Sequence, residues 1–251
     1  CDRAALEARI PGLRPGWVAG ALEPDCCDID VAALHQHYLA EARRKGVQVW
    51  CRAGLVAAEP GWTLRLSDGR VVGCDVLVNA AGAWADDVAR VAGAAPLGIA
   101  PLRRTVAQLR TDPAATNALP LVLDLSERFY FKPESGRIWL SPHDETPSAP
   151  CDAAPEDIDV AEAIARFEQV VDWRVERLEH RWAGLRSFAP DRLPVYGFDG
   201  HVPGFFWFAG QGGFGIQTAP AAAALGAGLL LGENAGPVDP APYDPRRFTA
   251  G

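Results

Sequence analysis

The sequence predicts an α/β (α+β) fold, in which a layered α/β domain built from both ends of the chain carries an inserted domain with a mixed or antiparallel sheet. Residues 75–92 and 205–231 predict the layered part, because each reads as a buried strand, a turn of small residues and a helix. Short strand-like runs separated by Pro, Asp, Ser and Gly lie between them and favour an antiparallel meander. We therefore expect one domain at 1–98 and 191–251 and an inserted domain at 99–190.

The second of these segments is rich in glycine. Residues 205–208 predict a buried strand, four glycines follow within 210–215, and residues 219–231 predict an alanine-rich helix that ends at Gly232. Glycine has no Cβ and tolerates positive φ, and the first turn of a helix presents free N–H groups and the positive end of its dipole. The turn therefore suits a flat or anionic ligand, or else it only lets the helix pack closely on the sheet.

The first segment has the same design. Residues 75–78 predict a buried strand, Asn79 to Gly82 form a turn of small residues, and a helix over 84–92 ends at Gly93. Two such turns at one edge of a sheet suggest a single elongated ligand that contacts both.

Local patterns also predict the other elements. A cap at Asp2 predicts a helix at 2–9, and apolar residues at helical spacing predict helices at 31–45 and 157–171. The turn residues Asp68 and Gly69 predict a hairpin of strands 62–66 and 70–72. An extended tail is expected after 232, and further strands are expected at 17–22, 47–51, 102–110, 121–125, 128–132, 137–141 and 175–188.

Charge and composition exclude several classes of function. The net charge of -8 argues against a general nucleic-acid-binding surface, and no uninterrupted apolar run is long enough to cross a bilayer. Cysteine spacing favours reduced thiols, and no signal peptide is present, so we expect a cytoplasmic protein. The chain contains no methionine and starts at Cys1, which predicts a fragment or a processed product.

No metal site is expected. His35 and His37 lie on one predicted helix but two positions apart, so they point to different sides, whereas a metal pair on a helix needs a spacing of three or four.

Four motifs, in this order along the chain, resemble the D-amino-acid oxidase family of FAD-dependent enzymes. They are Val-Leu-Val-Asn-Ala-Ala-Gly-Ala-Trp at 76–84, Phe-Tyr-Phe-Lys-Pro at 129–133, Trp-Ala-Gly-Leu-Arg-Ser-Phe at 182–188 and Gly-Gln-Gly-Gly-Phe-Gly-Ile-Gln-Thr at 210–218. Within the family, the D-arginine dehydrogenase branch is most similar. The resemblance implies an FAD-binding domain at 1–98 and 191–251 and a substrate domain at 99–190. The family's N-terminal Gly-x-Gly-x-x-Gly segment is not in this sequence, so the FAD-binding domain is expected to be incomplete.

The resemblance also implies roles for single residues. Arg186 and Tyr130 would hold the substrate carboxylate, with Arg104 as a further contact, and Gly213 and Gln217 would lie near the substrate. A planar guanidinium matches a carboxylate through two parallel hydrogen bonds. A buried ion pair between domains is the alternative role for Arg186.

Residues implied to contact the flavin come from three segments. They are Leu55, Ala80, Ala81, Gly82, Gly212, Gly213, Phe214, Gly215, Ile216 and Gln217. Leu121 and Leu123 would form the wall of the side-chain pocket, or else belong to the core.

The implied reaction is hydride transfer from the Cα of a D-amino acid to flavin N5, giving an imino acid and then a 2-oxo acid and ammonia. The sequence leaves the electron acceptor open. Two alternatives remain: a glycine- or sarcosine-type amine oxidase of the same family, and a truncated, non-catalytic interaction domain.

Overall fold

The computed structural model describes residues 1–233 and 236–248 and consists of two compact units. Unit 1 comprises Cys1–Cys26 and Leu102–Leu185, and unit 2 comprises Cys27–Pro101 and Arg186–Gly251.

This division differs from the predicted one chiefly at the N-terminus, where residues 1–26 belong to unit 1. Long-range contacts hold them there, because Arg14 Nε donates to the Glu168 carbonyl at 2.6 Å and the Trp17 ring packs edge-on against Phe129 at 5.7 Å. These contacts join residues that are far apart in the sequence, so hydrophobic periodicity could not predict them.

A six-stranded sheet forms the centre of unit 1, with strand order β10-β5-β8-β7-β6 and with β9 paired to β5. The strands are β5 (Ala100–Asp112), β6 (Val122–Leu123), β7 (Tyr130–Glu134), β8 (Arg137–Ser141), β9 (Thr146–Pro147) and β10 (Arg174–Phe188). The pairs β6–β7, β7–β8 and β5–β8 are antiparallel, which confirms the predicted meander.

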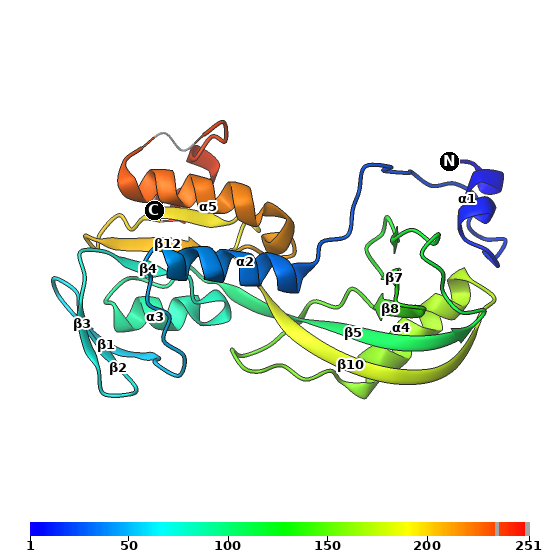
Figure 1. Cartoon of the computed structure of the whole chain (residues 1–251), viewed down its shortest axis with the longest axis horizontal. Helices are drawn as coiled ribbons and strands as arrows, with labels where there is room; N and C mark the ends of the chain where they lie inside the picture. The colour runs from blue at the N-terminus through cyan, green and yellow to red at the C-terminus, as the bar shows by residue number, and fades with distance from the viewer. Residues whose placement is uncertain (234–235, 249–251) are drawn as a thin grey trace. The chain divides into compact units, whose positions relative to one another are not determined.

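One face of this sheet carries the core of unit 1. Helix α4 (Asp157–Val170) buries Phe167 against Phe131 with ring centroids 5.1 Å apart, and it lies along the sheet in Figure 1. Helix α1 (Arg3–Arg9) begins at its predicted cap, Asp2. The strand predicted at 17–22 is wrong, because that segment forms only an isolated bridge from Ala19 to Asp2.

Unit 2 contains a mixed sheet with order β11-β12-β4 and a separate antiparallel sheet with order β1-β2-β3. The strands are β1 (Leu55–Glu59), β2 (Thr63–Leu66), β3 (Val71–Gly73), β4 (Leu77–Asn79), β11 (Val195–Phe198) and β12 (Phe205–Ala209). The central strand β12 runs parallel to β4 and antiparallel to β11. The predicted hairpin across Asp68 and Gly69 is confirmed as β2–β3.

Unit 2 also contains six helical segments among its described residues. They are α2 (Val31–Arg44), η1 (Gly82–Trp84), α3 (Ala85–Val91), α5 (Gly215–Leu231), η2 (Ala241–Tyr243) and η3 (Pro245–Phe248). Helix α5 packs on β11, where its Ala222 and Leu225 share a buried cluster with Tyr196. A separate core cluster contains Phe205 and Trp207, both fully buried, together with Ala85 and Ala89 of α3.

Two predictions about unit 2 differ from the structure. Residues 47–51 form no strand, and Val47, Val49 and Trp50 are exposed, so the apolar alternation there finds no partner strand among the described residues. The tail after Gly232 is partly helical where it is described, while residues 234–235 and 249–251 of it lie outside the described residues.

None of the helices in the described part combines the length and apolar character needed to cross a bilayer. Within the described residues, no group of three or more His, Cys, Asp or Glu side chains could hold a metal ion.

Candidate functional site

The two predicted turns lie at the same edge of the mixed sheet in unit 2. Strands β4 and β12 are parallel neighbours with Trp207 opposite Asn79, so the residues that follow their carboxyl ends leave the sheet side by side (Figure 1). This arrangement confirms the prediction that both turns share one sheet edge. In open α/β sheets, ligands bind at such an edge.

Asn79 anchors the first turn. Its side chain is buried, Nδ2 donates to the Ala85 carbonyl at 2.8 Å, and Oδ1 accepts from the Ala81 amide at 3.3 Å. Gly82 has a φ of +57°, and a Cβ added there would meet no atom within 4 Å. The backbone conformation therefore favours glycine at this position, while the space beside it is open.

The second turn is attached to the end of β10. Gly212 donates its amide to the Ser187 carbonyl at 2.8 Å and has a φ of +56°. A Cβ on Gly212 would lie 2.6 Å from the Phe188 ring. Glycine at 212 therefore allows the turn to pack closely on Phe188, which agrees with the alternative explanation for this glycine-rich turn. The same contact fixes the position of the turn relative to the end of β10.

Arg186 emerges from the same strand and lies over this turn. Its Nη1 donates to the Gly213 carbonyl at 3.5 Å, and a Cβ on Gly213 would come within 2.6 Å of that nitrogen. Among the described residues of unit 2, no carboxylate lies within ion-pairing distance, 4.0 Å, of Arg186. A half-buried guanidinium without a carboxylate partner in its own unit suits a carboxylate ligand.

The start of α5 completes the turn. Phe214 and Ile216 are 64% and 52% exposed, and Gly215 and Gln217 lie beside them in the first turn of the helix. A helix N-terminus presents N–H groups that lack intrahelical partners and the positive end of the helix dipole. Exposed apolar side chains beside such amides are features that a flat ring system with an electron-rich edge can bind.

Leu55, the remaining predicted flavin contact in unit 2, lies on β1 in the other sheet and packs against the core. The structure therefore brings Ala80 to Gly82 and Gly212 to Gln217 to one sheet edge but places Leu55 in a different sheet.

Tyr130 belongs to unit 1, at the start of β7 and opposite Ser141 and Leu123. Its neighbours Phe129 and Phe131 are buried, whereas Tyr130 is only half-buried. The predicted alternation is confirmed, so Tyr130 faces away from the core.

Leu121 and Leu123 are each 51% exposed. They do not belong to the core of unit 1, so the alternative explanation for them is wrong. Their predicted role as a pocket wall stays a prediction.

Arg104 also belongs to unit 1 and is 4% exposed. Its Nε donates to the Asp144 carbonyl at 2.7 Å, and its Nη2 lies 3.3 Å from a carboxylate oxygen of Glu145. The guanidinium therefore holds the loop that follows β8. These contacts give Arg104 a structural role, and its predicted contact with substrate stays a prediction.

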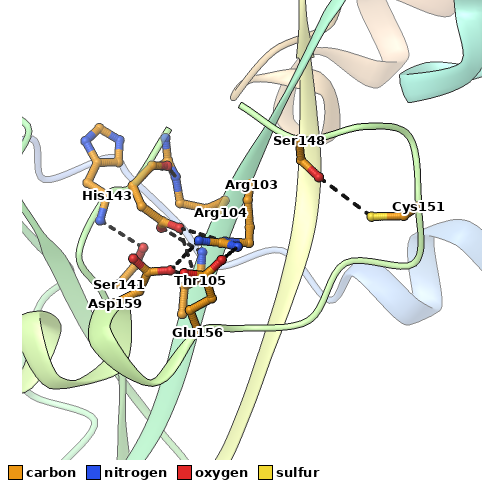
Figure 2. Close-up of polar contacts among 10 residues, drawn as sticks. Arg103, Arg104, Thr105, Ser141, His143, Ser148, Cys151, Glu156 and Asp159 are labelled. Carbon is orange, nitrogen blue, oxygen red and sulfur yellow. Dashed lines mark hydrogen bonds and ion pairs between the residues drawn. The ribbon is translucent and has the colours of Figure 1, made fainter. Parts of the chain in front are cut away.

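The adjacent Arg103 joins a second polar cluster, which Figure 2 shows between β5 and α4. Arg103 binds Glu156, lies 2.9 Å from Asp159 and reaches Asp144 at 4.0 Å. The hydrogen bond to Glu156 and the surrounding carboxylates raise the pKa of Arg103, although burial opposes them. The cluster links β5 to the start of α4 and to the loop after β8.

Sequence reasoning missed two residues near these positions. Asn79 was noted only as part of a turn, yet it fixes the conformation of that turn. His143 was not singled out, and its ring contacts Tyr130 edge-on at 5.7 Å. No local pattern marks His143, because the contact joins the start of β7 to a loop residue 13 positions further along the chain.

Curated relatives are similar over nearly the whole chain. The hydrogen cyanide synthase subunit HcnC of Pseudomonas aeruginosa is 28% identical over 254 residues, which cover 98% of this chain and 59% of the relative. Glycine oxidase of the same organism is 29% identical over 257 residues, which cover 95% of this chain and 65% of the relative. The chain thus spans about three fifths of the length of the curated relatives it matches.

Solved structures share the fold. L-proline dehydrogenase from P. horikoshii superposes with a TM-score of 0.84 at 20% identity, covering 99% of this chain and 68% of that one. Glycine oxidase from Geobacillus kaustophilus gives a TM-score of 0.69 at 23% identity, covering 81% of this chain and 54% of that one.

The resemblance seen in the four motifs is confirmed, while the D-arginine dehydrogenase branch stays a prediction. The model of the family described as FAD dependent oxidoreductase, which has FAD as its cofactor, matches residues 1–229. The chain belongs to the FAD-dependent oxidoreductase family.

Proposed function

We propose that the protein to which this chain belongs oxidises an amino acid at its Cα–N bond with FAD, and that Arg186 binds the substrate carboxylate. The observation that carries the proposal is the position of the Arg186 guanidinium on the glycine turn, without a carboxylate partner in unit 2. An arginine held in this way offers a planar pair of donors to a carboxylate, whereas one that is already ion-paired does not.

The flavin is proposed to lie at the shared sheet edge of unit 2. Ala80 to Gly82 would contact it on one side, and Gly212 to Gln217 at the start of α5 would contact it on the other. When bound, FAD supplies the chemistry, because its ring accepts the hydride released from the substrate Cα. The positive end of α5 favours negative charge on the ring. Since the chain covers about three fifths of its relatives, this activity is proposed for the whole protein.

Tyr130 is proposed as the second ligand of the substrate carboxylate. Its ring faces away from the core of unit 1 and is half-buried, so its hydroxyl is available to a ligand on that side of the sheet. A tyrosine hydroxyl would fix the orientation of the carboxylate and so direct the Cα–H bond. Arg104 would act indirectly, through the loop that it holds.

Two substrate classes remain as candidates. The four motifs led us to expect D-amino acids, whereas the similarity to proteins named glycine oxidase supports glycine or sarcosine. The carboxylate site proposed here is common to both classes, because every amino acid presents the same carboxylate.

The test uses the whole protein loaded with FAD and a panel of glycine, sarcosine, D-alanine and D-arginine. We expect release of a 2-oxo acid from at least one of them. We also expect that Arg186→Lys raises the KM for that substrate, because lysine lacks the planar fork of donors. The matched control is Arg65→Lys, at an exposed arginine on β2 that pairs with Glu59.

The panel also separates the substrate classes. Turnover restricted to glycine and sarcosine would exclude the D-amino-acid hypothesis. Failure to bind FAD or to oxidise any member of the panel would refute the proposed function and favour a non-catalytic interaction domain.

A further inference from the structure

His143 packs against the proposed substrate-binding tyrosine within unit 1. The His143 and Tyr130 rings meet edge-on, with centroids 5.7 Å apart and planes at 81°. On its other side, His143 Nδ1 lies 2.6 Å from the Glu127 carbonyl oxygen. A carbonyl can only accept, so Nδ1 carries the proton, and in the neutral ring Nε2 is left as the acceptor.

The backbone at both ends of this contact adopts an uncommon conformation. The φ angle is +58° at His143 and +56° at Glu127, a region that non-glycine residues rarely occupy. Ser141 Oγ accepts the His143 amide at 3.1 Å, a contact that Figure 2 shows as a dashed line. Left-handed non-glycine residues persist only where their surroundings hold them in place.

Helix α4 supplies part of that support through Arg166. Its Nη1 donates to the Pro142 carbonyl at 2.6 Å and also to the Arg128 carbonyl. Pro142 precedes His143, and Arg128 follows Glu127. The Arg166 guanidinium therefore links the loop that carries the His143 ring to the loop that carries the Glu127 carbonyl.

Residue 144 is fixed as well. The Asp144 carboxylate accepts from the Thr105 amide at 2.7 Å and from Thr105 Oγ1 at 2.9 Å. Arg104 Nε donates to the Asp144 carbonyl at 2.7 Å. His143 is therefore held through the residues on both of its sides, through its own amide and through its ring.

We infer that His143 is a positioning residue for Tyr130. Its fixed ring restricts the rotation of the Tyr130 side chain, so that the tyrosine hydroxyl stays directed at the substrate carboxylate. The inference rests on the proposed function, because it needs Tyr130 to bind substrate. His143 acts through Tyr130 and does not itself contact the reacting atoms.

A double-mutant cycle tests this inference in the FAD-loaded whole protein. The variants are His143→Asn, Tyr130→Phe and the double variant, and asparagine is chosen because it tolerates a left-handed φ. The measured quantities are KM and kcat for the best substrate of the panel and the inhibition constant of propionate, a carboxylate without an amine.

We expect His143→Asn to raise KM and the inhibition constant roughly three- to tenfold, the range of one aromatic pair, with kcat nearly unchanged. In the Tyr130→Phe background, which lacks the hydroxyl, the same change should have no further effect. The matched control is His180→Asn, at an exposed histidine stacked on Trp182, and it should leave both constants unchanged. If His143→Asn does not fold, His143→Gly replaces it, because glycine accepts positive φ.

A second readout needs no activity. In the 251-residue chain, the ring ¹⁵N shifts of His143 should show the tautomer with its proton on Nδ1. A proton on Nε2 instead would overturn the inference, because the contact with Glu127 could not then hold the ring.

The outcomes separate the inference from the proposed function. If Tyr130→Phe leaves the affinity for propionate unchanged, the role of Tyr130 is refuted and the inference fails with it. If Tyr130→Phe weakens propionate binding and His143→Asn weakens it by the same factor in both the native and the Tyr130→Phe backgrounds, the role of Tyr130 stands and the inference alone is overturned.

Discussion

Substitution of Gly213 by alanine tests the contact between the glycine turn and the Arg186 guanidinium. Gly213 has no positive φ, so its backbone conformation suits alanine. The added Cβ would lie 2.6 Å from Arg186 Nη1, however, whereas ordinary van der Waals contacts begin at 3.4 Å. The clash involves the end of a flexible side chain, so the fold should tolerate it while the guanidinium moves.

The magnitude follows from the contact that is lost. A shift of about 1 Å in a group that aligns the substrate can reduce turnover or affinity by about two orders of magnitude. A hydrogen bond to a charged group contributes about 1.5 to 3 kcal/mol, which corresponds to roughly 10- to 150-fold in affinity. We therefore expect KM to rise roughly 10- to 150-fold, with little change in the melting temperature.

The assay compares Gly213→Ala with Gly73→Ala in the FAD-loaded protein, by steady-state kinetics and thermal unfolding. Gly73 lies on β3 in the same unit, and a Cβ added there meets no atom within 4 Å. The control should leave KM unchanged. An unchanged KM in Gly213→Ala, with FAD bound, would show that Arg186 does not hold the substrate.

Three further predictions concern unit 2. Gly226→Ala places a Cβ 2.7 Å from the Phe208 ring, and we expect the free energy of unfolding, measured in urea, to fall by about 1 to 3 kcal/mol. The hydrogen bond from Arg247 to Asp191 holds the pKa of Asp191 below its ordinary value of 3.8, so the stability it contributes is present above that value and is lost as pH falls through the lower folded-state pKa. Asp191→Asn should therefore lower the melting temperature at neutral pH and flatten its dependence on acid pH, as thermal scans between about pH 2 and 7 would show. Arg186→Gln should weaken binding of propionate without lowering the melting temperature, as thermal shift with added propionate would show, because the long hydrogen bond to Gly213 contributes little to the fold.

Local signals predicted much of the fold. The cap at Asp2 marked where α1 begins, and Asp68-Gly69 marked the β2–β3 hairpin. These signals succeed because capping and turn formation depend on neighbouring residues only.

Elements that depend on distant partners were missed or misassigned. Residues 47–51 have the alternation of a strand but pair with no other strand among the described residues. Strand β11 was not predicted, because its four residues follow a proline-containing turn. Helix α5 begins at Gly215 instead of 219, because glycines in its first turn hide its start from a propensity argument.

Some features of the candidate site could be predicted from local sequence signals, and others could not. The shared sheet edge could be predicted, because two strand-turn-helix segments imply parallel neighbours. The contacts of Arg104 with the 144–145 loop and of His143 with Tyr130 could not, because each joins residues whose proximity only the folded sheet creates.

Rapid mixing of the FAD-loaded protein with its amino-acid substrate, in the absence of oxygen, tests the central claim most directly. We predict that the flavin absorbance bleaches, that the bleaching saturates with substrate concentration, and that Arg186→Gln shifts this saturation to concentrations at least about tenfold higher. Failure of every amino acid in the panel to bleach a bound flavin, or bleaching whose concentration dependence is the same in Arg186→Gln, would contradict the account.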